Sequence, residues 1–401
     1  MILKRQIEQV INSQIQWLDK SNKGVIREQV NAIKVIPNFA TIVTGIRRCG
    51  KSTMLMQLMA QYPQKETLYL NFEDIHLTGF SAEDFQRLHE IIVDRKTRRL
   101  FFDELQLVNG WEIFIHQLLR EGYTVYITGS NASMLSIELG THLTGRHLSS
   151  ELFPFSYDEF LSFTKQRRGE KSFVDYLKKG GMPEYLATLD TRIPTAMIDD
   201  ILVRDIAIRH NIRNLEPLKR IALYLLTNTA NLFSGNRLVS VVDNGISTST
   251  VLDYIDYMRD AYLIDTIGLY STNMRTTARN PKKVYAIDTG ISHSVTLSGS
   301  DDLGHLLENH QYLELRKKAN GHVYYYKNAG ECDFVVTGND NSPKELYQVC
   351  LNLTSENIDR EIGGLREAMR ELHINEGNII TLNDTDTLTV GEGIIKISKA
   401  Y

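Results

Sequence analysis

The stretch GIRRCGKS at residues 45–52 decides the fold, because it carries the full pattern G-x-x-x-x-G-K-[ST]. The apolar run TIVT at 41–44 precedes it, and the helix-like run STMLMQLMAQ at 52–61 follows it. A strand that ends in such a turn leaves backbone N–H groups pointing inward, and the start of a helix adds partial positive charge. The sequence therefore predicts a phosphate-binding loop (P-loop) between a strand and a helix.

The residue types in the loop predict their roles. Lys51 is expected to reach the β- and γ-phosphates of ATP, and the Ser52 hydroxyl is expected to bind Mg²⁺. For Arg47 and Arg48 an ion pair at the surface or between domains is favoured over phosphate contact, and Cys49 is expected to pack as a small core residue. The candidate nucleotide contacts are Gly45, Arg48, Cys49, Gly50, Lys51, Ser52 and Thr53.

A second candidate element is the apolar run RLFFDE at 99–104, which ends in two acidic residues. Asp103 is expected to hold Mg²⁺, and Glu104 is expected to orient and deprotonate an attacking water. An acidic pair after a strand is common by itself and is often only a solvated strand end. One strand after a P-loop, the functional interpretation is the stronger one.

Composition and length set the frame for these motifs. The 401 residues, 42% hydrophobic and 23% charged, predict several folded domains with no disordered or repeat-biased part. A formal charge of −4 gives no chain-wide positive field for a polyanion, so any nucleic-acid contact must be local. Three scattered cysteines predict a reducing, cytoplasmic setting, and no apolar run is long enough to predict a membrane span.

The order of apolar runs predicts the fold class and the domains. Short apolar runs alternate with amphipathic stretches in the N-terminal half, which predicts an α/β fold with a parallel sheet covered by helices on both faces. A mostly helical stretch follows, and strands return after residue 284. The expected domains are an ATPase domain at 1–165, a helical and winged-helix connector at 166–270, and a C-terminal domain at 271–401.

These motifs resemble the AAA-type ATPases. In that family the strand after the acidic one ends in a polar sensor, so the resemblance implies Asn131 (or Ser130) in VYITGSNA as a catalytic residue. It also implies an arginine at the subunit edge that reaches the neighbour's ATP, for which Arg146 is the match, and hence a homo-oligomer. A surface ion pair is the alternative role for Arg146. The resemblance further implies that the acidic strand lies beside the P-loop strand.

A narrower resemblance covers nearly the whole chain. The stretches NFED at 71–74, ELFPFSYDEF at 151–160 and GGMPEY at 180–185 are similar to bacterial and archaeal AAA-type ATPases that carry a C-terminal domain of unknown function. The ATPase motifs are specific, whereas each of the later stretches is a weak signal alone.

The middle segment has the layout of a winged helix-turn-helix, with helices expected at 216–227 and 236–242 and a third that opens at Ser247. The outer face of the third helix is acidic and predicts a poor DNA reader. The stretch 275–283 carries four cations and no acidic residue, and is the candidate nucleic-acid contact, although a spacer role for the module is slightly favoured. Those cations are Arg275, Arg279, Lys282 and Lys283.

The C-terminal domain resembles the restriction-endonuclease-like core of the PD-(D/E)xK nucleases. That resemblance implies Mg²⁺ held by acidic residues on adjacent elements, with Glu308 and Asp333 as the matches. The third position offers Gln348 followed by Val349 and Cys350 instead of (D/E)-x-K, which removes one acid and the expected cation. The domain is therefore predicted to be nuclease-like but catalytically degenerate.

Three hypotheses for function follow. The leading one is an ATPase that uses Mg²⁺ and couples hydrolysis to a conformational change of the C-terminal domain. The second is a DNA nuclease gated by ATP, and the third is a nucleotide-switched DNA- or protein-binding module with little turnover. The fold alone does not choose among them.

Overall fold

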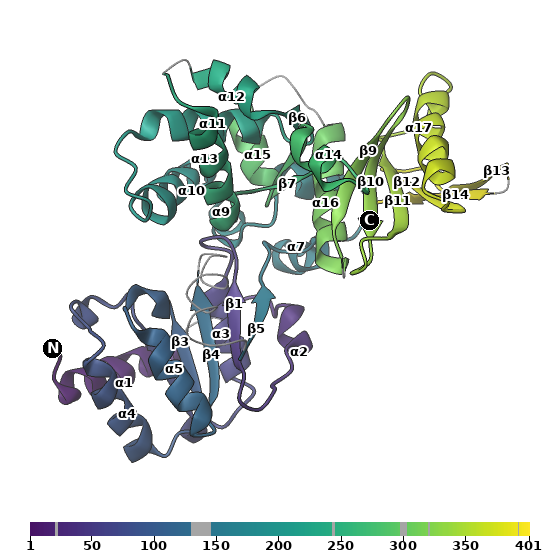
Figure 1. The fold of residues 1–401 in the computed structure, drawn as a ribbon. Helices are drawn as coiled ribbons and strands as arrows, with labels where there is room; N and C mark the ends of the chain where they lie inside the picture. The colour runs from purple at the N-terminus through teal and green to yellow at the C-terminus, as the bar shows by residue number, and fades with distance from the viewer. Residues whose placement is uncertain (21–22, 130–145, 243–244, 297–302, 320, 392) are drawn as a thin grey trace. The chain divides into compact units, whose positions relative to one another are not determined.

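The computed structural model divides the chain into two compact units, each of which is described by itself. Unit 1 is Met1–Phe163 with Asp260–Tyr262, and unit 2 is Thr164–Arg259 with Leu263–Tyr401. The predicted domain boundaries stay predictions. The structure describes residues 1–20, 23–129, 146–242, 245–296, 303–319, 321–391 and 393–401 (Figure 1).

Across these described ranges, every helix is too short or too polar to cross a membrane.

Unit 1 is built on a parallel sheet of five strands in the order β2-β3-β4-β1-β5. The expectation that the acidic strand lies beside the P-loop strand is wrong, because β4 pairs with both and separates β3 from β1. All strands still run the same way, so β1 and β3 end at one edge of the sheet. The strands are β1 Ala40–Thr44, β2 Thr67–Asn71, β3 Arg99–Asp103, β4 Thr124–Gly129 and β5 His147–Glu151.

Alternation along the strands explains why helices cover both faces of this sheet. In β3, the side chains of Leu100 and Phe102 lie in the core shared with α1, α4 and α5. Phe101 faces the opposite side of the sheet, where its ring stacks on that of Tyr126 with 4.7 Å between the ring centroids. Helix α3 packs on that second side, against β3 and β4 (Figure 1). The helices are α1 Lys4–Lys20, α2 Gln29–Ala32, α3 Lys51–Met59, α4 Asp84–Arg95, α5 Trp111–Arg120 and α7 Tyr157–Thr164, with 3₁₀ turns η1 Gln64–Glu66, η2 Ile75–Leu77 and η3 Leu105–Leu107.

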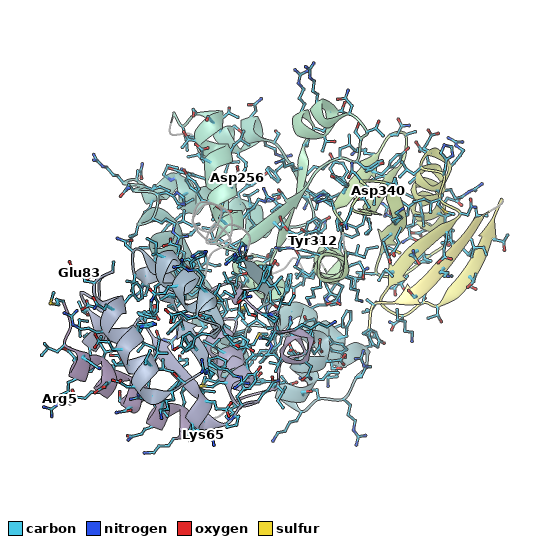
Figure 2. The ribbon with its side chains drawn as sticks, turned by 60° about the horizontal axis from the view of Figure 1, so that its bottom comes forward. Arg5, Lys65, Glu83, Asp256, Tyr312 and Asp340 are labelled. Carbon is cyan, nitrogen blue, oxygen red and sulfur yellow. The ribbon has the colours of Figure 1, made fainter. Side chains whose placement is uncertain are left out.

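The first part of unit 2 is helical, with a small antiparallel sheet in the order β6-β8-β7. Its three central helices, α11, α12 and α13, lie where the sequence predicts them, and the winged-helix interpretation stays a prediction. Asp256 is exposed on α13, in agreement with the acidic outer face that the sequence predicts for this helix (Figure 2). The elements are α8 Glu170–Lys179, α9 Pro183–Thr188, α10 Arg192–Asp200, the π-helix η5 Ile201–Ala207, α11 Leu215–Thr227, β6 Leu232–Phe233, α12 Gly235–Val242, α13 Thr248–Asp260, β7 Ile264–Ile267, α14 Met274–Arg279, β8 Lys282–Ala286 and α15 Thr289–Val295.

The stretch GGMPEY has a structural explanation. The buried Asp288 caps α15 through Ile291 N–H at 3.0 Å and also accepts the Gly181 N–H at 2.6 Å. A Cβ atom on Gly180, whose φ is +69°, would lie 2.1 Å from the Asp288 carboxylate, so only glycine fits this turn. Burial raises the pKa of Asp288 to about 6, although its backbone N–H partners oppose that shift.

The C-terminal part of unit 2 is a six-stranded sheet in the order β13-β14-β12-β11-β10-β9. Strands β9, β10 and β11 are antiparallel, and β12 then pairs parallel with β11 after the crossover helix α17. The predicted helix, three strands, helix, strand order is confirmed, and β13 and β14 extend the sheet beyond it. The elements are α16 Leu303–Lys318, β9 Val323–Lys327, β10 Glu331–Thr337, β11 Pro343–Val349, α17 Ile358–Glu371, β12 Glu376–Thr381, β13 Asp386–Val390 and β14 Gly393–Lys399.

Candidate functional site

The predicted P-loop connects the carboxyl end of β1 to the first residue of α3, Lys51. Two glycines make this turn possible. A Cβ atom on Gly45 would lie 2.2 Å from the Leu152 carbonyl oxygen, and Gly50 has φ of +101° directly before the helix. Gly45 therefore has no room for a side chain, and Gly50 adopts a backbone conformation that other residues rarely take.

Lys51 lies inside this loop and is 6% exposed. Its ammonium donates hydrogen bonds to the carbonyl oxygens of Gly45 and Ile46, both at 3.0 Å. Ser52 and Thr53 follow in the first turn of α3, where the helix dipole favours negative charge. The loop therefore gathers an ammonium, hydroxyls and a helix start within one short segment.

The other predicted loop residues take more peripheral places. Arg48 is exposed and has φ of +64°, and Arg47 lies 3.9 Å from the carboxylate of Glu73, an ion pair within unit 1. Cys49 is buried, as expected of a packing residue, and burial raises the pKa of its thiol. A raised thiol pKa keeps this cysteine protonated and unreactive.

Asp103 ends β3 as a fully buried carboxylate with two hydroxyl partners. Its Oδ2 accepts the Tyr69 hydroxyl from β2 at 2.8 Å, and its Oδ1 accepts the Thr128 hydroxyl from β4. Burial and the charge of Asp103 raise the pKa of Tyr69 strongly, so the phenol stays a donor. Asp103 is thus fixed from both neighbouring strands while its oxygens keep further acceptor capacity.

Glu104 has left-handed backbone geometry, with φ of +54° and ψ of +37°. This conformation is costly for a residue with a side chain and turns Glu104 out of the line of the strand. Its N–H donates to Thr128 Oγ1 at 3.1 Å, and its carboxylate accepts a hydrogen bond from Gln106. Burial raises the pKa of Glu104, although the charge of Lys51 opposes the shift.

Sequence reasoning missed Thr128 and Tyr69, the two residues that hold Asp103. The signal for Thr128 was its place as the last polar residue of the predicted strand Val125–Thr128. The predicted sensor, Asn131 or Ser130, lies outside the described residues. Arg146 is exposed directly before β5, where its carbonyl accepts the Ala40 N–H at 3.1 Å.

In unit 2, the structure brings the three predicted nuclease-remnant residues together. Asp333 N–H donates to the side-chain oxygen of Gln348 at 3.2 Å, and Lys283 bridges Asp333 and Glu308. The Lys283 Nζ lies 2.9 Å from Asp333 Oδ1, 3.2 Å from Glu308 Oε1 and 3.1 Å from Glu331 Oε1. We call these four residues (Lys283, Glu308, Glu331 and Asp333) the lysine cluster.

The lysine cluster corrects two expectations. The site was predicted to lack a cation, but Lys283 supplies one from β8 instead of from the (D/E)-x-K position. The stretch 275–283 was expected to be a basic loop or wing and a candidate nucleic-acid contact with four cations, but it forms α14 and the start of β8, and Lys283 is 3% exposed. Strand alternation turns Lys283 inward while the adjacent Lys282 stays half-buried, which linear charge counting does not show.

Charge balance in the lysine cluster is uneven, because three carboxylates share one ammonium. Burial alone would lower the pKa of Lys283, but the neighbouring carboxylates outweigh it and raise that pKa well above its usual value. Burial and the charge of Asp333 raise the pKa of Glu308 to about 7. Lys283 is therefore charged at neutral pH, while its surroundings favour the protonated form of Glu308 more than water would.

Within the described part of the chain, no group of three or more His, Cys, Asp or Glu side chains is arranged to hold a metal ion. The three carboxylates of the lysine cluster surround an ammonium instead. Cys332 and Cys350 are buried free thiols, as expected for core residues. Carboxylates held apart around an ammonium do not fit a preformed Mg²⁺ site. No catalytic step through a metal is therefore derived for the lysine cluster.

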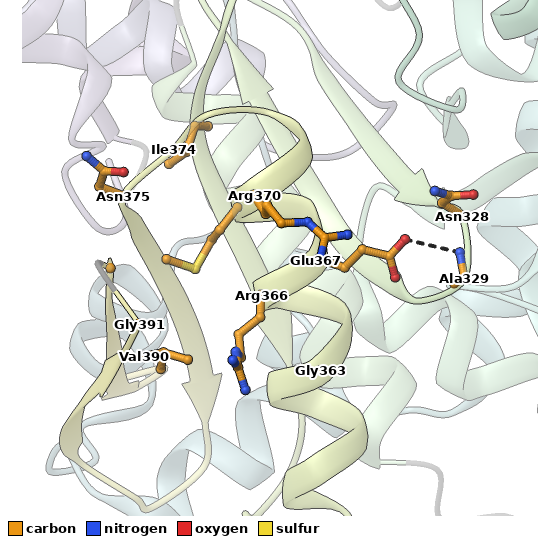
Figure 3. Close-up of a pocket in the computed structure, with 12 residues that line it drawn as sticks. Asn328, Ala329, Gly363, Arg366, Glu367, Arg370, Ile374, Asn375, Val390 and Gly391 are labelled. Atoms are coloured by element: carbon orange, nitrogen blue, oxygen red, sulfur yellow. Dashed lines mark hydrogen bonds between the residues drawn. The ribbon is translucent and has the colours of Figure 1, made fainter.

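A groove of about 720 Å³ lies elsewhere in the C-terminal sheet region, beside α17 (Figure 3). Arg366, Glu367 and Arg370 of α17 line it, and Glu367 accepts the Ala329 N–H at 3.2 Å. None of the residues that the sequence predicts for function lies in this groove.

Comparison with known proteins supports the class that the P-loop and parallel sheet define. Residues 37–161 match the AAA domain family, and residues 170–302 match a domain of unknown function (DUF8612). An uncharacterized protein of Methanocaldococcus jannaschii is 33% identical over 392 residues, covering 92% of this chain and 87% of its own. The chain therefore belongs to the AAA-type P-loop ATPases, in the same family as that protein.

Other similarities are weaker. An uncharacterized protein of Haemophilus influenzae is 29% identical over 318 residues, which is 74% of this chain and 79% of its own length. The structure of AMPPCP-bound DnaA from Aquifex aeolicus has a TM-score of 0.28 at 13% identity, with 63% of this chain and 88% of that chain covered. A TM-score this low supports no conclusion about this chain.

Proposed function

We propose that this protein binds ATP with Mg²⁺, hydrolyses it, and uses the cycle to change the conformation of its C-terminal domain. The observation that carries the proposal is the edge of the unit 1 sheet. There the glycine turn, the buried Lys51 and the paired Asp103 and Glu104 all follow the carboxyl ends of parallel strands.

Each side chain has a task that fits its surroundings. Phosphate oxygens would compete with the Gly45 and Ile46 carbonyls for the Lys51 ammonium, and charge-assisted bonds to phosphate are the stronger ones. Asp103 and Ser52 would hold Mg²⁺, which supplies charge neutralisation on the phosphates when bound. Glu104, with its raised pKa, would hold the attacking water and accept its proton.

Coupling to the rest of the chain is proposed through the segment that follows α13. Tyr262 belongs to unit 1, where its hydroxyl donates to Thr44 Oγ1 at 2.8 Å, one residue before Gly45. If hydrolysis changes the conformation of the P-loop, Thr44 would move with it. The hydrogen bond to Tyr262 would pass that movement to the end of α13, two residues earlier in the chain. In nucleotide switches, local changes in phosphate contacts produce larger rearrangements when they bias an element that has two arrangements.

Two variants test the proposal. Lys51→Ala should abolish Mg²⁺-dependent turnover and weaken ATP binding. Glu104→Gln should lower turnover by roughly 10²–10⁴-fold while it still binds ATP, because Glu104 acts on the water alone. Lys65→Ala in η1 is the matched surface control (Figure 2). Wild-type turnover in both site variants would overturn the assignment of this site.

A second candidate function is DNA cleavage gated by ATP, for which the lysine cluster supplies an ammonium but, among the described residues, no preformed Mg²⁺ site. The resemblance to PD-(D/E)xK nucleases asks for acids and an ammonium, and Lys283 supplies the ammonium that the strand lacks. Plasmid incubated with the protein, ATP and Mg²⁺ or Mn²⁺ is the test. Cleavage that is lost in Asp333→Ala but kept in the exposed control Asp340→Ala would establish this function (Figure 2), and no cleavage by wild type would reject it.

The third candidate, a nucleotide-switched DNA-binding module, now rests on three cations. Arg275 and Arg279 are exposed and Lys282 is half-buried. Replacing all three with alanine should weaken DNA binding and reduce the slope of log K against log salt by about 3. An unchanged slope would leave protein contact as the role of this surface.

A further inference from the structure

We propose that Arg27 is a positioning residue that sets the direction of a P-loop peptide, an inference that rests on the proposed nucleotide site. Arg27 lies before the P-loop strand and is 2% exposed. A buried guanidinium must be paired and hydrogen-bonded to be tolerated. The hydrogen-bond partners of the Arg27 guanidinium therefore identify the segments that it positions.

Three segments meet at this guanidinium. Nη1 donates to the Cys49 carbonyl of the P-loop at 2.9 Å, and Nη2 donates to the Phe153 carbonyl after β5 at 2.6 Å. Nε donates to the carboxylate of Glu159 in α7 at 2.9 Å, and the Phe155 ring lies 4.9 Å from the guanidinium carbon. The planar fork of arginine presents its donors to these three acceptors in fixed directions, whereas the ammonium of lysine is a single point on a flexible stem.

Both ends of this arrangement are fixed. Glu159 is 4% exposed and forms a reciprocal cap with Ser156, whose N–H it accepts at 3.0 Å and whose hydroxyl accepts the Glu159 N–H at 3.2 Å. On the other side, the Arg27 N–H donates to Gln57 of α3 at 3.0 Å, and Gln57 also holds the Val25 carbonyl at 2.7 Å. Arg27 is thus hydrogen-bonded to α3 and to α7, and at the same time to the Cys49 carbonyl of the P-loop.

The hydrogen bond from Arg27 to the Cys49 carbonyl also fixes the direction of the following N–H, that of Gly50. In a trans peptide the carbonyl and the following N–H point in opposite directions. Because Arg27 holds the Cys49 carbonyl on its own side, the Gly50 N–H is directed away from Arg27. Gly50 is the glycine before Lys51, so this N–H is one of the donors that would bind phosphate. The stretch ELFPFSYDEF thereby gains a role, since Phe153 and Glu159 hold the arginine.

The test is nucleotide affinity, measured with fluorescent ATP and ADP analogues. Without the hydrogen bond from Arg27 to the Cys49 carbonyl, part of the binding free energy must be spent on ordering the P-loop. Arg27→Ala should therefore raise the Kd of both nucleotides on the order of tenfold to a hundredfold. KM should rise in step while kcat changes far less, because the Gly50 N–H contacts phosphate in ground and transition states alike. Arg27→Lys keeps the charge beside Glu159 but not the fork, and carries the test if Arg27→Ala does not fold.

Arg87→Ala is the matched control, because Arg87 pairs with the buried Asp84 in α4 at 2.9 Å and has no part in the loop. It should lower stability without changing either Kd. Arg27 variants that lose stability yet keep wild-type Kd values would overturn this inference alone. A wild-type protein that binds neither nucleotide would overturn the proposed function, and this inference with it.

Discussion

Replacing Lys283 with methionine removes the ammonium of the lysine cluster at nearly constant volume. The change leaves Asp333 and Glu308, which are 8% and 12% exposed, without their counter-charge. Removing one partner of a buried ion pair costs about 3–5 kcal/mol of the free energy of unfolding, and two buried carboxylates place this case at the upper end. Glu331 adds little because it is 38% exposed and water screens it.

The loss should depend on pH. The charge of Lys283 opposes the raised pKa of Glu308, so without Lys283 the folded-state pKa of Glu308 lies further above its unfolded value and its ionisation costs more stability. A group whose pKa is raised in this way stabilises the fold fully below its unfolded pKa and loses that contribution as pH rises through its folded pKa. Glu308 has a raised pKa of about 7 even with Lys283 present. The deficit of Lys283→Met should therefore be larger at pH 8 than at pH 5.5, by about 1–2 kcal/mol.

The chain offers a clean assay for this prediction. Both tryptophans, Trp17 and Trp111, lie in unit 1, so tryptophan fluorescence reports on that unit while circular dichroism reports on the whole chain. In urea, Lys283→Met should shift the dichroism transition and leave the fluorescence transition in place. Lys282→Met, at the adjacent half-buried lysine, is the control. Equal stability of the two variants at both pH values would refute the argument.

Three further predictions follow from the sites described above. Thr128→Val, which removes a donor to Asp103 and the acceptor of the Glu104 N–H, should cost about 1–3 kcal/mol by urea unfolding of unit 1 and lower ATP turnover; unchanged turnover would separate Thr128 from catalysis. Asp288→Asn removes a group whose pKa is raised to about 6, so between pH 4 and 6.5 wild type should lose up to about 3 kcal/mol relative to the variant, and a constant difference would contradict this. If Arg146 acts on a neighbouring subunit, inactive Arg146→Ala mixed with inactive Lys51→Ala should regain turnover, and no recovery would argue against action in trans.

Local pattern was enough to predict the strands and the glycine turn that carry the candidate site of unit 1. The strands, the glycine turn and the acidic pair each occupy a short stretch, and their periodicity and residue types specify them without knowledge of the rest of the chain. Strand order is different, because it depends on which distant strands pair. For that reason β4 was not expected between β1 and β3, and Thr128 was not recognised as the partner of Asp103.

The residues that sequence reasoning missed or misplaced act across long distances along the chain. Arg27 and Glu159 are 132 positions apart, and Lys283 and Asp333 are 50 positions apart. Nothing in the local sequence marks Arg27 as buried, since an isolated arginine is usually exposed. Lys283 was counted with its exposed neighbours because a run of charges in sequence hides the alternation of a strand. Burial and pairing became visible only in the fold.

One measurement tests the central claim most directly: ATP binding and Mg²⁺-dependent phosphate release measured side by side for wild type and Glu104→Gln. Both proteins should bind ATP with similar Kd values, and only wild type should turn it over at a substantial rate, because Glu104 acts on the water and not on the nucleotide. Equal phosphate release by the two proteins, or no ATP binding by wild type, would contradict that claim.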